Sequence, residues 1–581
     1  MANNFKNGLS PAITISTILS LILLTVGILY CLYYGRIGYM PQDSPTVFDG
    51  GWRILSGQIP FRDFTLPNAI LPIFLQAFLF KLFGINWFVY CLHAALFNGL
   101  FCVIVFYFLR MFGGTLLLSF FYALLSGIVF YTPFGIPVQD QHAYFFTFLL
   151  IFLACLSSRV AKPLLKQLIF FSLPFVTIIA FLSKQIPTIF GVALAGSILL
   201  VTERRNLFML IRSIMVGALA VSILLLALYN TFGIDFELLK VYFYHLPAET
   251  GSARITRVIS SNFLRTIIYM NHHWRLFFPF ALVSMVFLGV LLFVCMRFTF
   301  ARTRPYWKEL SKRMENNLFP LFIAQFLLVI CFLFVILTNN QRENGVPLIF
   351  ISLGLTQIFV SAVLNQDQYD NATLSFLRQR LAPGLISFIL VGSSFWCAWN
   401  FDRQVNATRM VHDFIYQRND NQNPKQEMHE TLSFLIWGVP KKYSGTREDF
   451  LKITDYFQRN TGNFYLLGDS SILYALTGRP SVNPVLWFHP GQTLPHKGST
   501  FFPSFEGRLM EALRKYHVRY IVLEETRVAP HISTWSGVNL EYFPALNELV
   551  QKKGCERKRF GPFTIIELMM PFDKNSSRNH K

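Results

Sequence analysis

Charged side chains are scarce in this chain: Asp, Glu, Lys and Arg make up only 14% of its 581 residues. A soluble domain of ordinary composition carries about 25% charged residues. Hydrophobic residues make up 53% of the chain, and 63 residues are phenylalanines. The shortage of charge excludes an ordinary soluble globular protein and indicates an integral membrane protein.

Acidic residues are scarcer than basic ones, with 31 against 51, so the formal net charge is +20. A strongly basic chain can be a nucleic-acid-binding protein. Here, however, the basic residues fall in short loops between apolar stretches, where they set the orientation of a membrane protein. The sequence also lacks Cys and His clusters with zinc spacing and aromatic residues interleaved with a basic stripe. We therefore expect no nucleic-acid partner.

Cysteine is sparse too, with 8 residues. Of these, only Cys555 lies in the polar C-terminal part, and the others lie in or beside hydrophobic stretches. The C-terminal part therefore cannot contain an internal disulfide. A cysteine in an apolar stretch is most often a small buried apolar residue, so the cysteines do not indicate a catalytic site.

Long hydrophobic stretches are the main positive feature of the sequence. A helix needs about 20 mostly apolar residues to cross the hydrocarbon core of a bilayer, and about eleven stretches qualify. They are residues 11–34, 87–109, 115–133, 142–158, 165–183, 186–202, 212–232, 276–296, 318–338, 346–364 and 384–400. The first is too long for a signal peptide and is poorly followed by a small-residue cleavage site, so we interpret it as a retained anchor.

Basic residues cluster in alternate loops between these stretches. The clusters are Arg159, Lys162 and Lys166; Arg204, Arg205 and Arg212; Arg297, Arg302, Arg304, Lys308, Lys312 and Arg313; and Arg378 and Arg380. If each stretch crosses the membrane in turn, all four loops share one side, and the positive-inside rule makes that side cytoplasmic. The N-terminus is then inside, whereas the loop after the first span and the C-terminal part lie outside the cytoplasm.

Residues 68–84 are apolar but short, and Pro67 and Pro72 interrupt their start. Counting them as a span would place every later basic cluster outside, against the charge rule. We therefore expect these residues to form an interfacial helix that lies along the membrane surface.

From about residue 401 the hydrophobic runs shorten and turn signals multiply. Residues 463–468 and 518–523 are typical of short buried strands, and residues 505–515 and 545–553 of amphipathic helices. This alternation predicts a small α/β domain. The expected fold is therefore mainly α: a polytopic membrane helical bundle over residues 1–400, followed by an extracytoplasmic α/β domain over residues 401–581.

The most informative polar stretch follows the first span, over about residues 35–86. It places Asp43, Asp49, Arg53, Arg62 and Asp63 within an otherwise apolar part of the chain. Ionisable residues held at a membrane boundary indicate a functional site. We therefore expect the chemistry of the protein in this opening loop.

Segments of the opening loop resemble the GT-C superfamily of membrane glycosyltransferases, in the branch near protein O-mannosyltransferases and the lipid A aminoarabinose transferase. They are Ile54-Leu55-Ser56-Gly57, Pro60-Phe61-Arg62-Asp63-Phe64 and, after a Pro-containing helix, Phe78-Leu79-Phe80-Lys81-Leu82-Phe83-Gly84. Two later segments, Pro137-Val138-Gln139-Asp140-Gln141-His142 and Phe181-Leu182-Ser183-Lys184-Gln185, are similar to family segments at the fourth span and between the fifth and sixth. The resemblance extends through the first seven spans, and beyond them it is one of layout.

The sequence departs from the family pattern at two points. Asp43 is followed by Ser44, where the family commonly has an Asp-Glu pair. An arginine that the family often has early in the second span is replaced around Cys91. These departures leave the identity of the acceptor open.

The resemblance implies an inverting glycosyltransferase that moves a sugar from a polyprenyl-phosphate donor to a lipid, glycan or protein of the cell envelope. It implies a reaction on the outer face of the cytoplasmic membrane and allows a divalent cation, Mg²⁺ or Mn²⁺, as cofactor. Two other functions stay open: a transporter or flippase of lipid-linked glycans, and a non-catalytic envelope assembly protein. A transporter would be expected to show broken helices with polar residues at the membrane midplane. Here the ionisable residues concentrate outside the spans, which favours the enzyme.

Asp43 is the first candidate catalytic residue, because the resemblance places the family's catalytic Asp there. Such a carboxylate acts as a general base on the acceptor hydroxyl or amine. The alternative is that Asp43 or Ser44, which precedes Pro45, caps a helix. Asp49 either assists the reaction or binds a metal, or it is an acid favoured by the dipole in the first turn of a helix.

Two further acids are candidates. Asp63 is expected to pair with Arg62 or Arg53 and to shape the loop. Asp140 begins the fourth span, where it either contributes to catalysis by orienting the acceptor or binding a metal, or stabilises a helix N-terminus.

Arg53, Lys184 and Arg257 are candidates to hold the donor phosphate, by a bidentate guanidinium contact or as a point charge. The alternative for Lys184 is an interfacial lysine whose head group reaches water. His245, in the polar stretch 233–275, is a further candidate, although the histidines of that stretch lack metal spacing.

Overall fold

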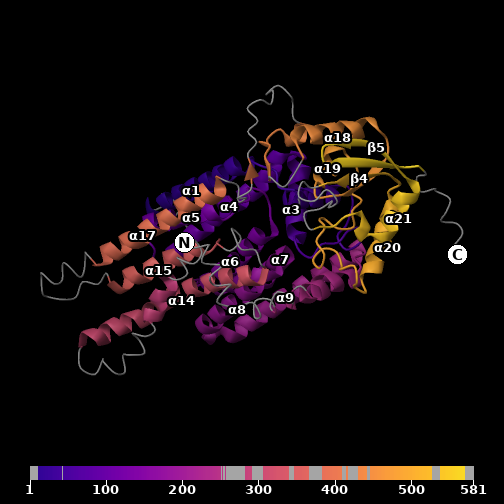
Figure 1. Ribbon diagram of the computed structural model, residues 1–581. Coiled ribbons are helices and arrows are strands. Elements are labelled where there is room, and N and C mark those ends of the chain that lie inside the picture. Colours follow the sequence, from indigo (N-terminus) through magenta and orange to yellow (C-terminus); the bar gives the residue numbers. More distant parts are fainter. Residues whose placement is uncertain are drawn as a thin grey trace, which may run out of the picture.

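The computed structural model describes residues 11–41, 43–249, 251–252, 256, 282–290, 305–338, 346–364, 382–407, 414–415, 429–440, 445–525 and 537–569. These residues form a bundle of long helices with a small mixed sheet near the C-terminus, as Figure 1 shows. The expectation of a mainly α chain with α and β elements in its C-terminal part is confirmed.

Seven of the described helices are long and apolar enough to cross a membrane. Six of them fall within α1 (Pro11–Gly35), α4 (Trp87–Met111), α6 (Gln139–Ser157), α7 (Pro163–Ser183), α8 (Gln185–Thr202) and α14 (Pro305–Thr338), and the other, Arg204–Phe232, contains α9 (Leu207–Phe232). Each corresponds to one of the predicted spans. The chain is therefore a membrane protein by the length and composition of its helices.

The other predicted spans differ from these seven. Helices α5 (Leu116–Val129) and α15 (Ile349–Leu364) have 14 and 16 residues. At 1.5 Å per residue they are about 21 and 24 Å long, shorter than a hydrocarbon core of about 30 Å. Helix α17 (Ala382–Phe401) covers the last predicted span. The stretch 276–296 lies largely outside the described residues, so the number of eleven spans stays a prediction.

The opening loop forms two short helices, α2 (Asp43–Leu55) and α3 (Ile70–Phe83). Helix α3 has 14 residues and is shorter than the hydrocarbon core, and its location along the membrane surface stays a prediction. The two helices approach closely at Gly50 and Gly51, where a Cβ atom would overlap the Ile73 side chain or touch that of Gln76. The glycine pair therefore allows α2 to lie directly against α3.

The C-terminal part contains a four-stranded sheet in the order β3-β4-β6-β5, with β3 and β4 parallel and the other pairs antiparallel. The strands are β3 (Asn463–Leu467), β4 (Val518–Glu524), β5 (Gly554–Phe560) and β6 (Phe563–Leu568). The helices are α18 (Arg447–Arg459), α19 (Ile472–Leu476), α20 (Phe502–Lys515) and α21 (Pro544–Lys553). Both predicted strands and both predicted helices of this part are present.

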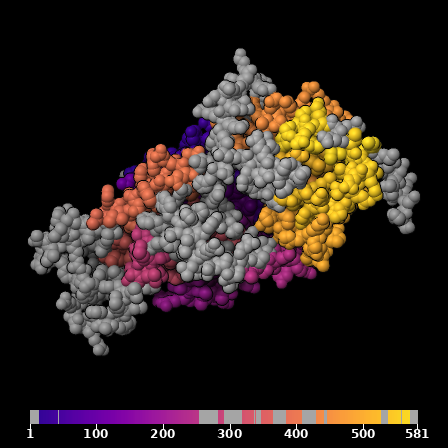
Figure 2. Space-filling model, viewed as in Figure 1, coloured from indigo at the N-terminus to yellow at the C-terminus, as the bar shows by residue number. Residues whose placement is uncertain are grey.

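The C-terminal part sits against one end of the helical bundle, as the orange and yellow regions of Figures 1 and 2 show. Backbone hydrogen bonds join the two regions: Gly38 N–H donates to the Ile436 carbonyl at 2.9 Å and Thr65 N–H to the Pro484 carbonyl at 2.8 Å. The Tyr242 hydroxyl donates to the Thr493 carbonyl at 2.9 Å. We call this end of the bundle the capped end.

Exposed aromatic residues lie near the capped end. Tyr33 at the end of α1 and Trp396 and Trp399 at the end of α17 are 49–52% exposed. Tyrosine and tryptophan gather at the interface between lipid and water in membrane proteins. The opening loop follows α1 directly, so we expect it close to this interface.

Candidate functional site

Helix α2 begins at Asp43, the side chain of which lies outside the described residues. The next residue, Ser44, is held by hydrogen bonds to its side chain and to its backbone carbonyl. The Ser44 hydroxyl accepts a hydrogen bond from Met40 N–H at 2.9 Å, and the Ser44 carbonyl accepts one from the Tyr90 hydroxyl at 2.7 Å. The start of α2, and Asp43 with it, is thereby tied to α4 at the capped end.

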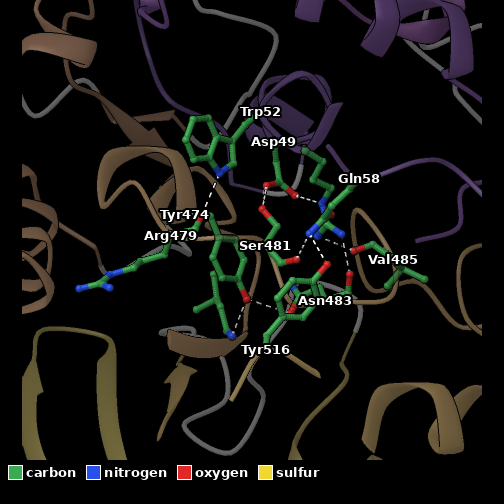
Figure 3. A network of polar contacts seen from close by, with 11 residues as sticks. Asp49, Trp52, Gln58, Tyr474, Arg479, Ser481, Asn483, Val485 and Tyr516 are labelled. Atoms are coloured by element: carbon green, nitrogen blue, oxygen red, sulfur yellow. Dashed lines mark hydrogen bonds and ion pairs between the residues drawn. The ribbon is translucent and has the colours of Figure 1, made fainter. Parts of the chain in front are cut away.

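Asp49 and Arg53 lie one turn apart on α2 and form an ion pair at 2.8 Å, with both side chains fully buried. The Ser481 hydroxyl donates to Asp49 at 2.5 Å. The Arg53 guanidinium also donates to the carbonyls of Asn483 at 2.6 Å and Val485 at 3.4 Å (Figure 3). Every nitrogen of Arg53 thus has a protein partner, whereas the sequence suggested that Arg53 holds the donor phosphate.

Asp63 lies at the rim of the same loop. It accepts hydrogen bonds from Ile59 N–H at 2.9 Å and from Arg62 at 2.7 Å, and it pairs with Lys515 of α20 at 2.8 Å. Burial alone would raise the pKa of Asp63, but these donors outweigh it and hold the pKa below its ordinary value. Asp63 therefore pairs with Arg62, one of its two expected partners, and also links the loop to the C-terminal part.

Asp140 and Lys184 form a second ion pair at 2.5 Å, with side chains 4% and 14% exposed. Asp140 lies in the first turn of α6, and Lys184 lies at the joint between α7 and α8. The ammonium group of Lys184 lies 5.1 Å from the centre of the Phe334 ring. The structure thus brings together two residues that the sequence suggested for different roles, the acceptor side and the donor phosphate.

Several buried polar atoms around this pair have no hydrogen-bond partner among the described residues. They are both amide atoms of Gln141 and the side-chain oxygen of Asn68. Tyr144 packs against the Phe334 ring at 5.1 Å, the same ring that Lys184 faces. Buried polar groups are normally satisfied by protein, water or ligand. Their presence beside a buried ion pair indicates a place for a polar ligand.

The opening loop reaches this region directly. Ala69 N–H donates to the Ser183 carbonyl at 3.0 Å, and the Gln185 side chain donates to the Pro67 carbonyl at 3.1 Å. Asn68, with its unpartnered oxygen, is therefore held next to the joint that contains Lys184. The spacing of apolar residues in the sequence did not predict this contact between the opening loop and the joint of α7 and α8.

A buried polar chain runs behind the site and was also missed by the sequence. The ring of His93 contacts Gln76 at 3.0 Å and His142 at 2.9 Å, and His142 contacts Tyr131. All these groups are fully buried. The chain joins α3, α4 and α6, so it fixes the first turn of α6, where Asp140 lies.

The remaining candidates lie apart from this pair or cannot be placed. His245 ends the π-helical turn Val241–His245 and packs against the Phe501 ring at 5.3 Å. Arg257 lies outside the described residues. Within the described part of the chain, no group of three or more His, Cys, Asp or Glu side chains could hold a metal ion.

In comparisons with known proteins, no family model and no curated sequence matches this chain. The resemblance to the GT-C superfamily therefore rests on the quoted segments of the sequence. The function is argued below from the geometry of the capped end.

Proposed function

We propose that this protein is an integral membrane glycosyltransferase that transfers a sugar from a polyprenyl-phosphate donor to an envelope acceptor at the capped end. The observation that carries the proposal is the Asp140–Lys184 pair. A nearly buried cation lies there beside polar groups that find no hydrogen-bond partner in the described part of the chain, at the end of the bundle where α2 begins.

Lys184 has the properties that a donor phosphate requires. A polyprenyl-phosphate sugar is a phosphodiester with one negative charge, and the polyprenyl phosphate that leaves gains a further charge as the sugar–oxygen bond breaks. A cation in a site of low water content stabilises this developing charge more than the initial charge. Asp140 serves as the counter-ion of Lys184 when no donor is bound, because an unpaired buried charge is costly.

Asp43 is the proposed general base. The acceptor oxygen or nitrogen attacks the anomeric carbon, the bond from that carbon to the phosphate oxygen breaks, and the proton of the acceptor moves to the Asp43 carboxylate. General-base catalysis of this kind typically contributes about 10²–10⁴-fold to the rate. Asp140 is paired with Lys184 and takes no part in this proton transfer.

The position of the site suits a substrate with a long lipid tail. Exposed aromatic residues near the capped end support a location of this end at the membrane boundary. Helices α7 and α9 expose large apolar side chains, including Leu168, Leu219 and Ile223. A polyprenyl chain can remain among such side chains and the lipid while its head group reaches Lys184.

The test is sugar transfer by the purified protein in lipid vesicles that contain labelled polyprenyl-phosphate sugars. Lys184→Met should raise the KM for the donor at least tenfold, because the phosphate loses its cation. The matched control is Lys166→Met, which breaks the pair between Lys166 and Glu203 at the other end of α7 and should leave KM unchanged. Equal effects of the two substitutions would contradict the proposal. Movement of donor across the vesicle membrane without a glycosylated product would favour a flippase instead.

A further inference from the structure

The C-terminal segment 479–485 lies directly against the opening loop. Five of its backbone carbonyls accept hydrogen bonds from that loop, four of them from side chains and that of Pro484 from a backbone N–H. The donors are Trp52 to Arg479, Gln58 to Ser481, Arg53 to Asn483 and Val485, and Thr65 to Pro484. Buried carbonyls require partners. The donors of the loop therefore supply the hydrogen bonds that the carbonyls of the segment need (Figure 3).

Every side-chain oxygen and nitrogen of the Asp49–Arg53 ion pair inside this contact has a hydrogen-bond partner. Both oxygens of Asp49 are used, one by Arg53 and one by Ser481. The Arg53 guanidinium uses each of its three nitrogens and lies 5.0 Å from the centre of the Phe64 ring. Neither side chain has any exposed surface. The two residues thus hold α2 against the segment and do not face a substrate.

Helix α2 is also held on its other sides. Gly50 and Gly51 lie against α3, and Phe48 packs against the rings of Phe80 and Tyr90 at 4.8 and 5.2 Å. On the side of the C-terminal part, α19 also contacts the helix, and segment 479–485 supplies hydrogen bonds to Asp49, Trp52 and Arg53. From Arg53 back to Asp43 the helix rises about 15 Å, so a tilt at Asp49 moves its first residue.

We infer that segment 479–485, through Ser481, Asp49 and Arg53, positions helix α2 and thereby sets the place of Asp43 at the reaction centre. Asp49 and Arg53 are positioning residues in this arrangement. The C-terminal part is then a component of the active enzyme. The link to reaction rests on the proposed function, whereas the fixing of α2 does not.

The structural half of the inference is tested by hydrogen exchange on the full-length protein in detergent or lipid. Ser481→Ala removes one hydrogen bond to Asp49 and retains the ion pair, so the fold is expected to persist. Exchange of the α2 amides should rise severalfold, while exchange in α6 stays unchanged. The control is Lys515→Met, which breaks an exposed contact between the same two regions but does not touch α2. Unchanged α2 exchange in Ser481→Ala would overturn the inference.

The catalytic half is tested by kinetics with the same variants. Ser481→Ala and Trp52→Phe should lower kcat about tenfold, because a misplacement near 1 Å can cost up to ~10²-fold in rate. KM for the donor should stay within about twofold of wild type, since Lys184 is untouched. A rise in KM with unchanged kcat would overturn the positioning role.

The two proposals fail in different ways. If the wild-type protein transfers no sugar, the proposed function falls, and the exchange result alone decides whether the segment fixes α2. If the wild type transfers sugar and Ser481→Ala loosens α2 without lowering kcat, the proposed function stands and the link to reaction is wrong.

Discussion

The buried pair of Asp49 and Arg53 allows a quantitative prediction for the substitution Arg53→Met. Methionine keeps much of the apolar volume but removes the charge and all three hydrogen-bonding nitrogens. It leaves Asp49 buried with Ser481 as a partner, and it leaves the carbonyls of Asn483 and Val485 without Arg53. Removing one partner of a buried pair costs about 3–5 kcal/mol.

The exposed contact between Lys515 and Asp63 joins the same two regions and supplies the comparison. The Lys515 side chain is 57% exposed. Exposed pairs of this kind contribute about 0–1 kcal/mol, so Lys515→Met should cost no more than that. The difference between the two variants is therefore at least about 2 kcal/mol, a factor of about 30 in the unfolding equilibrium.

The measurement is unfolding of the purified protein in mixed micelles with increasing denaturing detergent, followed by tryptophan fluorescence. Arg53→Met should unfold at a clearly lower detergent fraction than Lys515→Met. Adding Asp49→Asn to Arg53→Met should restore about 1–3 kcal/mol of the free energy of unfolding, because the buried carboxylate without its cation is removed. If Arg53→Met and Lys515→Met are equally stable, the pair does not fasten the two regions and the reasoning is refuted.

Two further predictions concern the same end of the molecule. Because its partners hold the pKa of Asp63 below the ordinary value, its contribution to stability is present above the unfolded pKa of about 3.9 and is lost as the pH falls through the folded pKa. Asp63→Asn should therefore flatten the loss of thermal stability below about pH 4, and an unchanged pH profile would contradict this. Gly50→Ala should lower stability by about 1–3 kcal/mol, because the new methyl group overlaps Ile73. Gly196→Ala, where nothing lies within 4 Å, should be neutral or stabilising in the same thermal assay. Equal effects at the two glycines would show that α2 and α3 are not closely packed.

The sequence predicted the parts of the fold that depend on local pattern. Apolar length located the long helices, and the alternation in the C-terminal part located β3, β4, α20 and α21. The lengths of α5 and α15 were overestimated, because hydrophobicity continues into residues that do not extend the helix. Helix ends depend on turns and caps, which composition does not determine.

The candidate site was predicted less completely, because its contacts join distant parts of the chain. The sequence selected Asp140 and Lys184 but gave no reason to pair residues 44 positions apart. It grouped Asp49 and Arg53 with the chemistry, whereas their partners, Ser481 and Asn483, are more than 400 positions away. The sequence pattern around a charged residue in the opening loop does not distinguish a catalytic residue from one that anchors a distant segment.

The central claim is that Asp43 takes the proton of the acceptor in a sugar transfer that uses a polyprenyl-phosphate donor. The most direct measurement is single-turnover transfer of labelled sugar by the wild-type protein and by Asp43→Asn, in vesicles saturated with donor. Asparagine is similar in size but cannot act as a base at neutral pH, so the rate should fall by about 10²-fold or more while donor binding persists. Transfer by Asp43→Asn at the wild-type rate would contradict the account.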